Sequence, residues 1–287
     1  MDFGRLITAM VTPFDTDLQI QWSEVGRLID YLIDEQKNDS IIISGTTGES
    51  PTLSEEEKLQ LFEYAVKHAN GRAKIIAGTG SNDTAHTISL TQKAEKSGVD
   101  GILLVMPYYN RPSQEGLYQH CKAVAESTKL PIMLYNVPTR AGVNLLPETT
   151  ARLSLLPNVH STKEAISDME QITKLFTLVD DDFIVYCGDD SQTLPMLALG
   201  AYGVVSVASH VVGNSIKEMI HEHLQGNHGE AAKIHRKLFP VFKGIFTFPS
   251  PAPIKEALRL HGMETGGVRL PLLNATEDEA KFIKSLF

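Results

Sequence analysis

Short apolar segments that alternate with amphipathic segments constrain the fold of this chain more than any other feature of its sequence. Eight apolar runs are rich in β-branched residues and show no polar–apolar alternation. This composition is typical of parallel strands that are buried on both faces. The predicted strands are Ile7–Val11, Ser40–Ser44, Lys74–Ala77, Gly101–Met106, Pro131–Tyr135, Val159–Thr162, Phe183–Cys187 and Gly203–Val207.

The segments between these runs have the spacing of amphipathic helices. Leu28 and Leu32, for example, fall on one face of a helix, and Ser54 and Glu57 have the spacing of a capping box. The predicted helices are Ser23–Glu35, Ser54–His68, Thr84–Lys96, Gln114–Ser127, Pro147–Leu155, Asp168–Val179 and Ser191–Ala198.

Eight strand–helix units predict an α/β fold, a closed (β/α)8 TIM barrel, with a doubly wound open sheet as the alternative. The chain has 287 residues, more than the predicted barrel needs. The rest is predicted to be helical, over Ser215–Leu224, His228–Phe246, Pro253–His261 and Glu277–Ser285. We therefore expect a catalytic barrel over residues 1–222 and a C-terminal helical region over residues 223–287, packed on the barrel.

Composition excludes several classes of function. The net charge of −9 argues against a broad nucleic-acid surface. The two cysteines form no CxxC motif, and His221 and His223 face different directions on a predicted helix, so we expect no metal site and no cofactor. We find neither a signal-peptide pattern nor a run of about 18 apolar residues, so we expect a cytoplasmic protein without a membrane partner.

The active site of a barrel enzyme lies at the carboxyl ends of its strands, and Lys163 follows the sixth predicted strand. A lysine in this place is desolvated, which favours the neutral amine that attacks a carbonyl to form an imine. A salt-bridged or surface lysine is the alternative. Tyr135 ends the preceding strand and is suited to carry protons beside Lys163, or else to pack at the barrel top.

Residues that follow the second, fourth and fifth predicted strands are also suited to bind a carboxylate or to transfer protons. Thr46 and Thr47 lie between glycines, where backbone N–H groups and two hydroxyls form a small anion cradle or a plain turn. Arg140 is suited to clamp a carboxylate, unless it is merely solvated. Tyr109 is suited to stacking, to proton relay or to a subunit interface.

Four motifs occur in order, one at each of four strand ends: Gly45–Glu49, Pro107–Asn110, Tyr135–Arg140 and Lys163–Ala165. With these motifs, essentially the whole chain resembles the pyruvate-dependent class I aldolase family, which includes N-acetylneuraminate lyase. The resemblance is greatest to the lyases of this family that condense pyruvate with L-aspartate 4-semialdehyde on the route to diaminopimelate and lysine.

The resemblance implies the roles of the catalytic residues. Lys163 is expected to form a Schiff base with pyruvate, and Tyr135 is expected to carry protons. Thr46 is expected to link Tyr135 to Tyr109, which in this family reaches the site of a neighbouring subunit. The family therefore implies a homo-oligomer, at least a dimer and commonly a dimer of dimers.

The resemblance also implies how the substrates are bound. Thr46 and Thr47 are expected to hold the pyruvate carboxylate, and Arg140 is expected to engage the carboxylate of the second substrate. Gly188 and Val205 match positions whose carbonyls line the site. The alternative is N-acetylneuraminate lyase or another sugar-acid aldolase. Arg140 and Thr47 argue against this alternative.

One departure from the family pattern concerns feedback inhibition by L-lysine. Ser50, Asn82 and Tyr108 match the effector site of the lysine-inhibited relatives. Four positions differ from that site: Pro51, Glu55, Lys58 and His86, of which His86 replaces a glutamate. Because a carboxylate there would bind the effector's ammonium, we expect inhibition by L-lysine to be weak or absent.

Overall fold

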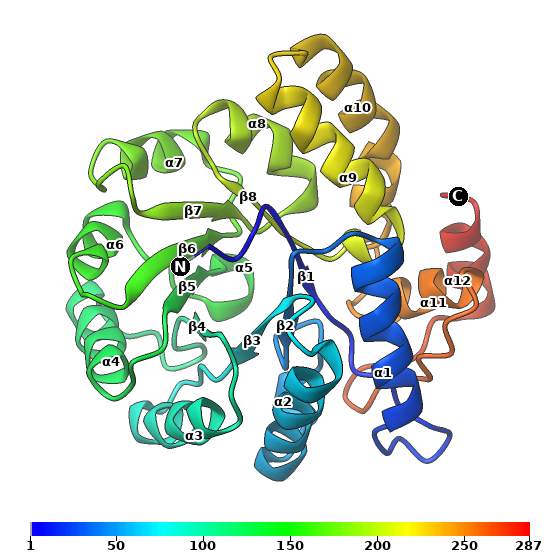
Figure 1. The fold of residues 1–287 in the computed structure, drawn as a ribbon, viewed down its shortest axis with the longest axis horizontal. Helices are drawn as coiled ribbons and strands as arrows, with labels where there is room; N and C mark the ends of the chain where they lie inside the picture. The colour runs from blue at the N-terminus through cyan, green and yellow to red at the C-terminus, as the bar shows by residue number, and fades with distance from the viewer. Residues whose placement is uncertain (1) are drawn as a thin grey trace.

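The computed structural model describes residues 2–287 and shows eight parallel strands closed into a barrel, in which β1 pairs with β8 (Figure 1). All eight predicted strands are confirmed, and the open-sheet alternative is excluded. The strands are β1 (Leu6–Ala9), β2 (Ser40–Ile43), β3 (Lys74–Gly78), β4 (Gly101–Val105), β5 (Ile132–Asn136), β6 (Val159–Glu164), β7 (Ile184–Cys187) and β8 (Gly203–Ser206).

The strands are apolar on both faces because each face packs against a different core. Side chains such as Ile42, Ile76 and Met133 fill the barrel interior, whereas the alternate residues pack against the surrounding helices. Phe3 belongs to the inner core. A Cβ at Gly101 would lie 2.5 Å from its ring, so glycine lets Phe3 pack at the start of β4.

Helices surround the barrel between the strands (Figure 1). They are α1 (Trp22–Asp30), α2 (Glu55–Ala69), α3 (Thr84–Lys96), α4 (Gln114–Glu126), α5 (Pro138–Ala141), α6 (Pro147–Ser154), α7 (Met169–Phe176) and α8 (Thr193–Ala198), with short 3-10 turns at Ser50–Thr52 and Asp190–Gln192. The predicted capping box at the start of α2 is present: the Ser54 hydroxyl accepts from Glu57 N, and Ser54 N donates to Glu57. The helix predicted over Ser23–Glu35 instead changes to a π-helix at Tyr31–Glu35.

The C-terminal part contains α9 (Ser209–Leu224), α10 (His228–Gly244), α11 (Ala252–Leu260) and α12 (Glu277–Lys284). Helix α9 begins earlier than predicted, and a kink with non-helical backbone at Val212 explains why the apolar pattern is regular only beyond it. The expected boundary between residues 222 and 223 falls within the last turn of α9, and it stays a prediction. None of the helices within residues 2–287 is long and apolar enough to cross a membrane.

Candidate active site

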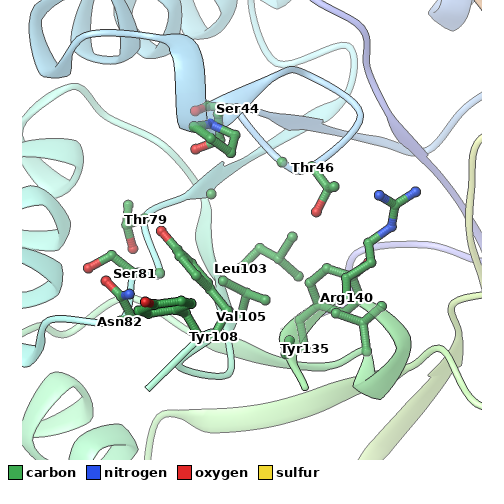
Figure 2. Close-up of a pocket in the computed structure, with 18 of the residues that line it drawn as sticks. Ser44, Thr46, Thr79, Ser81, Asn82, Leu103, Val105, Tyr108, Tyr135 and Arg140 are labelled. Carbon is green, nitrogen blue, oxygen red and sulfur yellow. The ribbon is translucent and has the colours of Figure 1, made fainter. Parts of the chain in front are cut away.

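A cavity of about 790 Å³ opens at the carboxyl ends of β2 to β5 (Figure 2). Four of the predicted site residues line it: Thr46, Tyr109, Tyr135 and Arg140. In Figure 2, Tyr135 and Arg140 lie on one side of the cavity, and Tyr108 lies on the other with Ser81 and Asn82. The cavity therefore occupies the place where barrel enzymes carry their active sites.

Lys163 lies beside Tyr135 because the two residues are register partners on β6 and β5. Both side chains are buried, with 5% and 6% of their surface exposed. Lys163 Nζ lies 4.1 Å from the centre of the Tyr135 ring. The ion pairs formed within residues 2–287 do not include Lys163, and its burial contradicts the alternative of a salt-bridged or surface lysine. Lys163 does not itself line the cavity, whereas Tyr135 does.

The loop after β2 leaves two backbone donors available. Within residues 2–287, the N–H groups of Thr46 and Thr47 donate to no acceptor, whereas Glu49 N donates to Thr46 O at 3.1 Å. Thr46 lines the cavity, whereas Thr47 is buried and is not among the residues that line it. Ser44, predicted as the end of the second strand, leaves the strand with φ 58° and also faces the cavity. The loop is therefore an irregular turn with free donors at a cavity wall, as an anion cradle requires.

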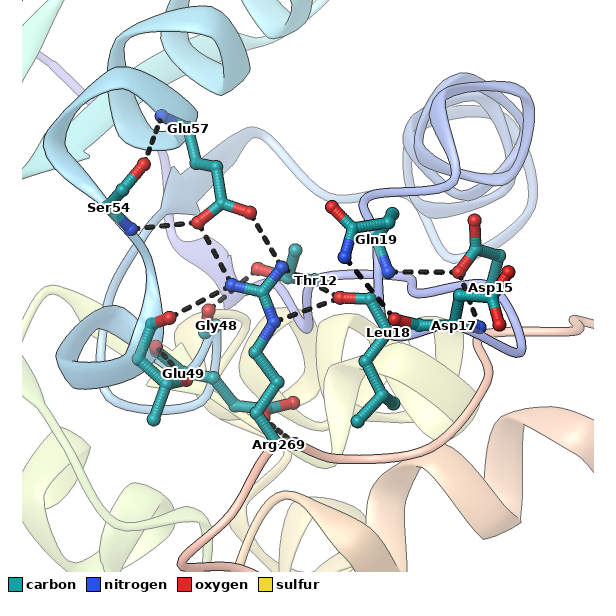
Figure 3. A network of polar contacts seen from close by, with 11 residues as sticks. Thr12, Asp15, Asp17, Leu18, Gln19, Gly48, Glu49, Ser54, Glu57 and Arg269 are labelled. Carbon is teal, nitrogen blue, oxygen red and sulfur yellow. Dashed lines mark hydrogen bonds and ion pairs between the residues drawn. The ribbon is translucent and has the colours of Figure 1, made fainter.

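Glu49, the last residue of this loop motif, is held from the C-terminal part of the chain (Figure 3). Its Oε1 lies 2.9 Å from Lys255 Nζ, and its Oε2 accepts from Arg269 N at 2.9 Å. Glu49 and Lys255 are 2% and 3% exposed, and Lys255 also donates to Gly267 O at 2.6 Å. Burial lowers the pKa of Lys255 to about 8, although Glu49 acts in the opposite direction. Glu49 is thus an anchor for the loop, a role that sequence reasoning missed.

Arg269 extends this network to the start of α2 (Figure 3). Its guanidinium donates two hydrogen bonds to the Glu57 carboxylate, at 2.9 and 2.6 Å, and these bonds lower the pKa of Glu57. It also donates to Thr52 O and to Leu18 O. One arginine side chain therefore joins the segments that precede and follow β2.

Tyr109 and Arg140 project from irregular segments at the cavity rim. Tyr109 is 89% exposed and has φ 73°, a left-handed conformation that is rare for an aromatic residue. Its N–H donates to Ala141 O at 3.3 Å, which ties it to the end of α5. Arg140 lies in α5, a four-residue helix too short to predict from periodicity, and its side chain is exposed. Both side chains are therefore accessible to ligands or to another subunit.

Gly188 and Val205 lie near Lys163 and inside the barrel, respectively, and neither lines the cavity. A Cβ at Gly188 would lie 3.0 Å from Lys163 Cγ and 2.9 Å from Ala165 Cβ, so a glycine leaves room for the lysine stem. Val205 on β8 belongs to the inner core together with Tyr135.

Asp190 and His210 organise the end of β8 without lining the cavity. Buried Asp190 accepts from the N–H groups of Val207 and Ala208, both at 3.1 Å, and burial raises its pKa to about 6. His210 accepts from Val11 N at 3.1 Å, and burial lowers its pKa to about 4. Asp190 and His210 each follow a predicted strand by three residues, but nothing in the sequence indicates that they face away from the cavity.

The residues compared with an effector site lie together in the structure. Ser50, Pro51, Lys58, Asn82, His86 and Tyr108 all line the same cavity. Glu55 pairs with Lys93 and lies 3.7 Å from His86 Nδ1. This part of the cavity therefore presents Lys58 and His86 where the resemblance expects a histidine and a glutamate.

The fold and the cavity define a (β/α)8-barrel protein with its candidate active site at the carboxyl ends of the strands. A sequence model of the dihydrodipicolinate synthetase family matches residues 2–287. The chain is 54% identical to the 4-hydroxy-tetrahydrodipicolinate synthase of Bacillus subtilis, over 99% of this chain and 98% of that protein.

Solved structures agree with the sequence comparison. A dihydrodipicolinate synthase of Bacillus anthracis is 49% identical, with a TM-score of 0.98 over 100% of this chain and 98% of that one. The Cyanidioschyzon merolae enzyme, solved with lysine bound, is 42% identical, with a TM-score of 0.96 over 99% of this chain and 97% of that one. The chain belongs to the dihydrodipicolinate synthetase family.

Proposed function

We propose that the chain is a lyase that condenses pyruvate with L-aspartate 4-semialdehyde to give 4-hydroxy-tetrahydrodipicolinate, in diaminopimelate and lysine biosynthesis. The observation that carries the chemistry is Lys163, a buried lysine without a carboxylate partner within residues 2–287, at the end of β6 beneath a cavity. Its family and the names of its relatives indicate which carbonyl compound it attacks.

Lys163 would act as the nucleophile. Its neutral amine adds to C2 of pyruvate, the carbinolamine loses water to give an imine, and loss of a C3 proton gives an enamine. Tyr135 is the proton carrier for these steps, because its ring lies 4.1 Å from Lys163 Nζ and it also lines the cavity. C3 of the enamine then attacks the aldehyde, and the amine of the second substrate displaces Lys163 to release the cyclic product.

Two groups of donors would hold the carboxylates. The free N–H groups of Thr46 and Thr47, with their hydroxyls, suit the pyruvate carboxylate. Arg140, exposed at the rim, suits the carboxylate of L-aspartate 4-semialdehyde. The carbonyls of Gly188, which directly follows β7, and of Val205 on β8 are proposed to line the site. The net charge of −9 repels both substrates at long range, so these local donors must supply the attraction.

Tyr109 supports a homo-oligomer, a dimer or a dimer of dimers. An 89% exposed tyrosine in a left-handed conformation is costly in an isolated chain and is suited to enter the site of a second copy. There it would join Thr46 and Tyr135 in a proton relay. A cytoplasmic location belongs to the same proposal, as does weak or absent inhibition by L-lysine.

Borohydride reduction in the presence of pyruvate tests the chemistry. We expect one covalent adduct on Lys163, which Lys163→Ala abolishes and the matched cavity variant Lys58→Ala retains. Peptide mapping that finds no adduct on Lys163 in the parent enzyme would refute the mechanism. A coupled assay that compares L-aspartate 4-semialdehyde with N-acetylmannosamine distinguishes the synthase from the sugar-acid aldolase, and turnover of only the second acceptor would overturn the synthase.

A further inference from the structure

A second pair of residues lies one position beyond the proposed catalytic pair on the same two strands. Tyr135 is opposite Lys163, and Asn136 is opposite Glu164. Because successive side chains of a strand point to opposite faces, Asn136 and Glu164 face the helices while Tyr135 faces the interior. Asn136 and Glu164 are 0% and 1% exposed, so this second pair is fully buried.

The Glu164 carboxyl group is hydrogen-bonded through both oxygens. Asn136 Nδ2 donates to Oε2 at 2.9 Å, and Thr162 Oγ1 donates to Oε1 at 2.8 Å. Asn136 is fixed in turn, because its Oδ1 accepts from Leu145 N at 3.0 Å and its Nδ2 lies 2.9 Å from Asn144 Oδ1. The pair thus forms a cross-strand clip between β5 and β6 that is braced by the segment before α6.

The clip lies where the backbone ladder of the sheet ends. Ala165 N donates to Asn136 O at 2.9 Å, and Gly188 N donates to Glu164 O at 2.7 Å. Residues Asn136 and Glu164 therefore form the final rung that joins β5, β6 and β7, directly beside the Tyr135–Lys163 rung. Any shift of β6 at this rung moves Lys163 relative to the Tyr135 ring.

Joining two strands through a buried carboxyl group costs free energy, because the group loses its contact with water. Burial raises the pKa of Glu164 to about 7, against the effect of the hydrogen bonds from Asn136 and Thr162. An apolar residue would avoid that cost, and strongly perturbed carboxyl groups are concentrated at functional sites. This cost indicates that the clip serves the site rather than stability.

We propose that Glu164 is a positioning residue for imine formation: through Asn136 and Thr162 it holds Lys163 against Tyr135. The inference rests on the proposed function, because it concerns the rate of the Lys163 reaction. Glu164 is buried away from the cavity and touches no reacting atom. A displacement of about 1 Å in a reacting group slows a reaction by up to about 100-fold.

The test measures the rate of borohydride-trapped pyruvate adduct formation on Lys163 in Glu164→Leu, Glu164→Gln and Thr162→Val. We expect about 10- to 100-fold slower trapping in Glu164→Leu, at constant pyruvate KM, because the nucleophile and not the carboxylate site is displaced. Glu164→Gln should restore trapping to within about threefold, because its amide oxygen still accepts from Asn136. Leu104→Ala, a buried change on the outer face of β4, is the control for lost stability and should trap at the parent rate.

Thr162→Val keeps the inference testable if Glu164→Leu does not fold. It removes one hydrogen bond from the carboxyl group, and we expect about 3- to 10-fold slower trapping. Trapping at the parent rate in a folded Glu164→Leu or in Thr162→Val overturns the inference, as does equal slowing in Leu104→Ala. Failure of the parent enzyme to trap pyruvate overturns the proposed function instead, so the two failures are distinguishable.

Discussion

The ion pair between Glu49 and Lys255 gives the sharpest prediction for stability. Both side chains are almost completely buried, and their charged atoms are 2.9 Å apart. The pKa of Lys255 falls from 10.5 to about 8, which means that pairing with Glu49 leaves about 3 kcal/mol of the cost of burying the ammonium uncompensated. The pair therefore stabilises the fold little as a whole, while each partner depends strongly on the other.

Lys255→Met should lower the free energy of unfolding by about 3–5 kcal/mol, because it leaves the Glu49 carboxylate buried without a cation. The double variant Glu49→Gln/Lys255→Met should return to within about 1 kcal/mol of the parent, since no buried charge remains. The glutamine oxygen still accepts from Arg269 N, which makes Glu49→Gln the appropriate partner change.

Urea unfolding followed by circular dichroism, at one protein concentration for all variants, measures these differences. Lys233→Met is the matched control, because Lys233 pairs with Glu230 at the exposed surface, and we expect it to cost less than about 1 kcal/mol. A loss below about 1 kcal/mol in Lys255→Met would show that the Glu49 carboxylate does not depend on Lys255. A double variant no more stable than Lys255→Met alone would show that the loss does not come from an unpaired buried carboxylate.

Three further predictions concern pH, the proton relay and the effector. Burial raises the pKa of Glu164 in the folded state from 4.5 to about 7, so between these pH values the folded state binds a proton that the unfolded state has lost. The free energy of unfolding should therefore fall by about 3 kcal/mol as the pH rises from 4.5 to 7. Glu164→Gln should lack this fall in urea unfolding at several pH values, and parallel curves for parent and variant would contradict the assignment. Tyr109→Phe should lower kcat for condensation by about 100-fold without changing the oligomeric mass. Full activity in this variant would exclude Tyr109 from the proton relay. Tyr118→Phe, on the outer helix α4, is the control. L-lysine should give half-inhibition only above about 1 mM, and inhibition below that concentration would show that His86 and Lys58 still accommodate the effector.

The sequence was sufficient to predict the barrel because each strand can be recognised from its own run of apolar, β-branched residues. The β-branched runs are buried on both faces, and their ends differ from the prediction by at most two residues. The helical elements that differ have local physical causes. The π-helix at Tyr31–Glu35 keeps the helical apolar pattern, and α5 has only four residues.

The site was predictable as a set of strand ends but not as a set of contacts. Lys163 and Tyr135 could be paired from the parallel strand order, since Tyr135 is the last residue of its predicted strand and Lys163 directly follows the next one. Glu49, by contrast, reads as part of the cavity loop, and its partners Lys255 and Arg269 lie more than 200 positions later in the sequence. No local pattern indicates such a pairing, so the anchor became visible only in the structure.

Because Glu49 is held by residues near the C-terminus, the carboxylate loop can reach its final structure only after most of the chain has been synthesised. The loop that carries Thr46 and Thr47 leaves the ribosome early, but the groups that hold it, Lys255 and Arg269, are synthesised near the end. A nascent or frameshifted chain that stops before Lys255 has every side chain of the proposed chemistry and lacks both of the groups that hold its carboxylate loop. Activity therefore depends on completion of the polypeptide, and truncated products should bind pyruvate weakly.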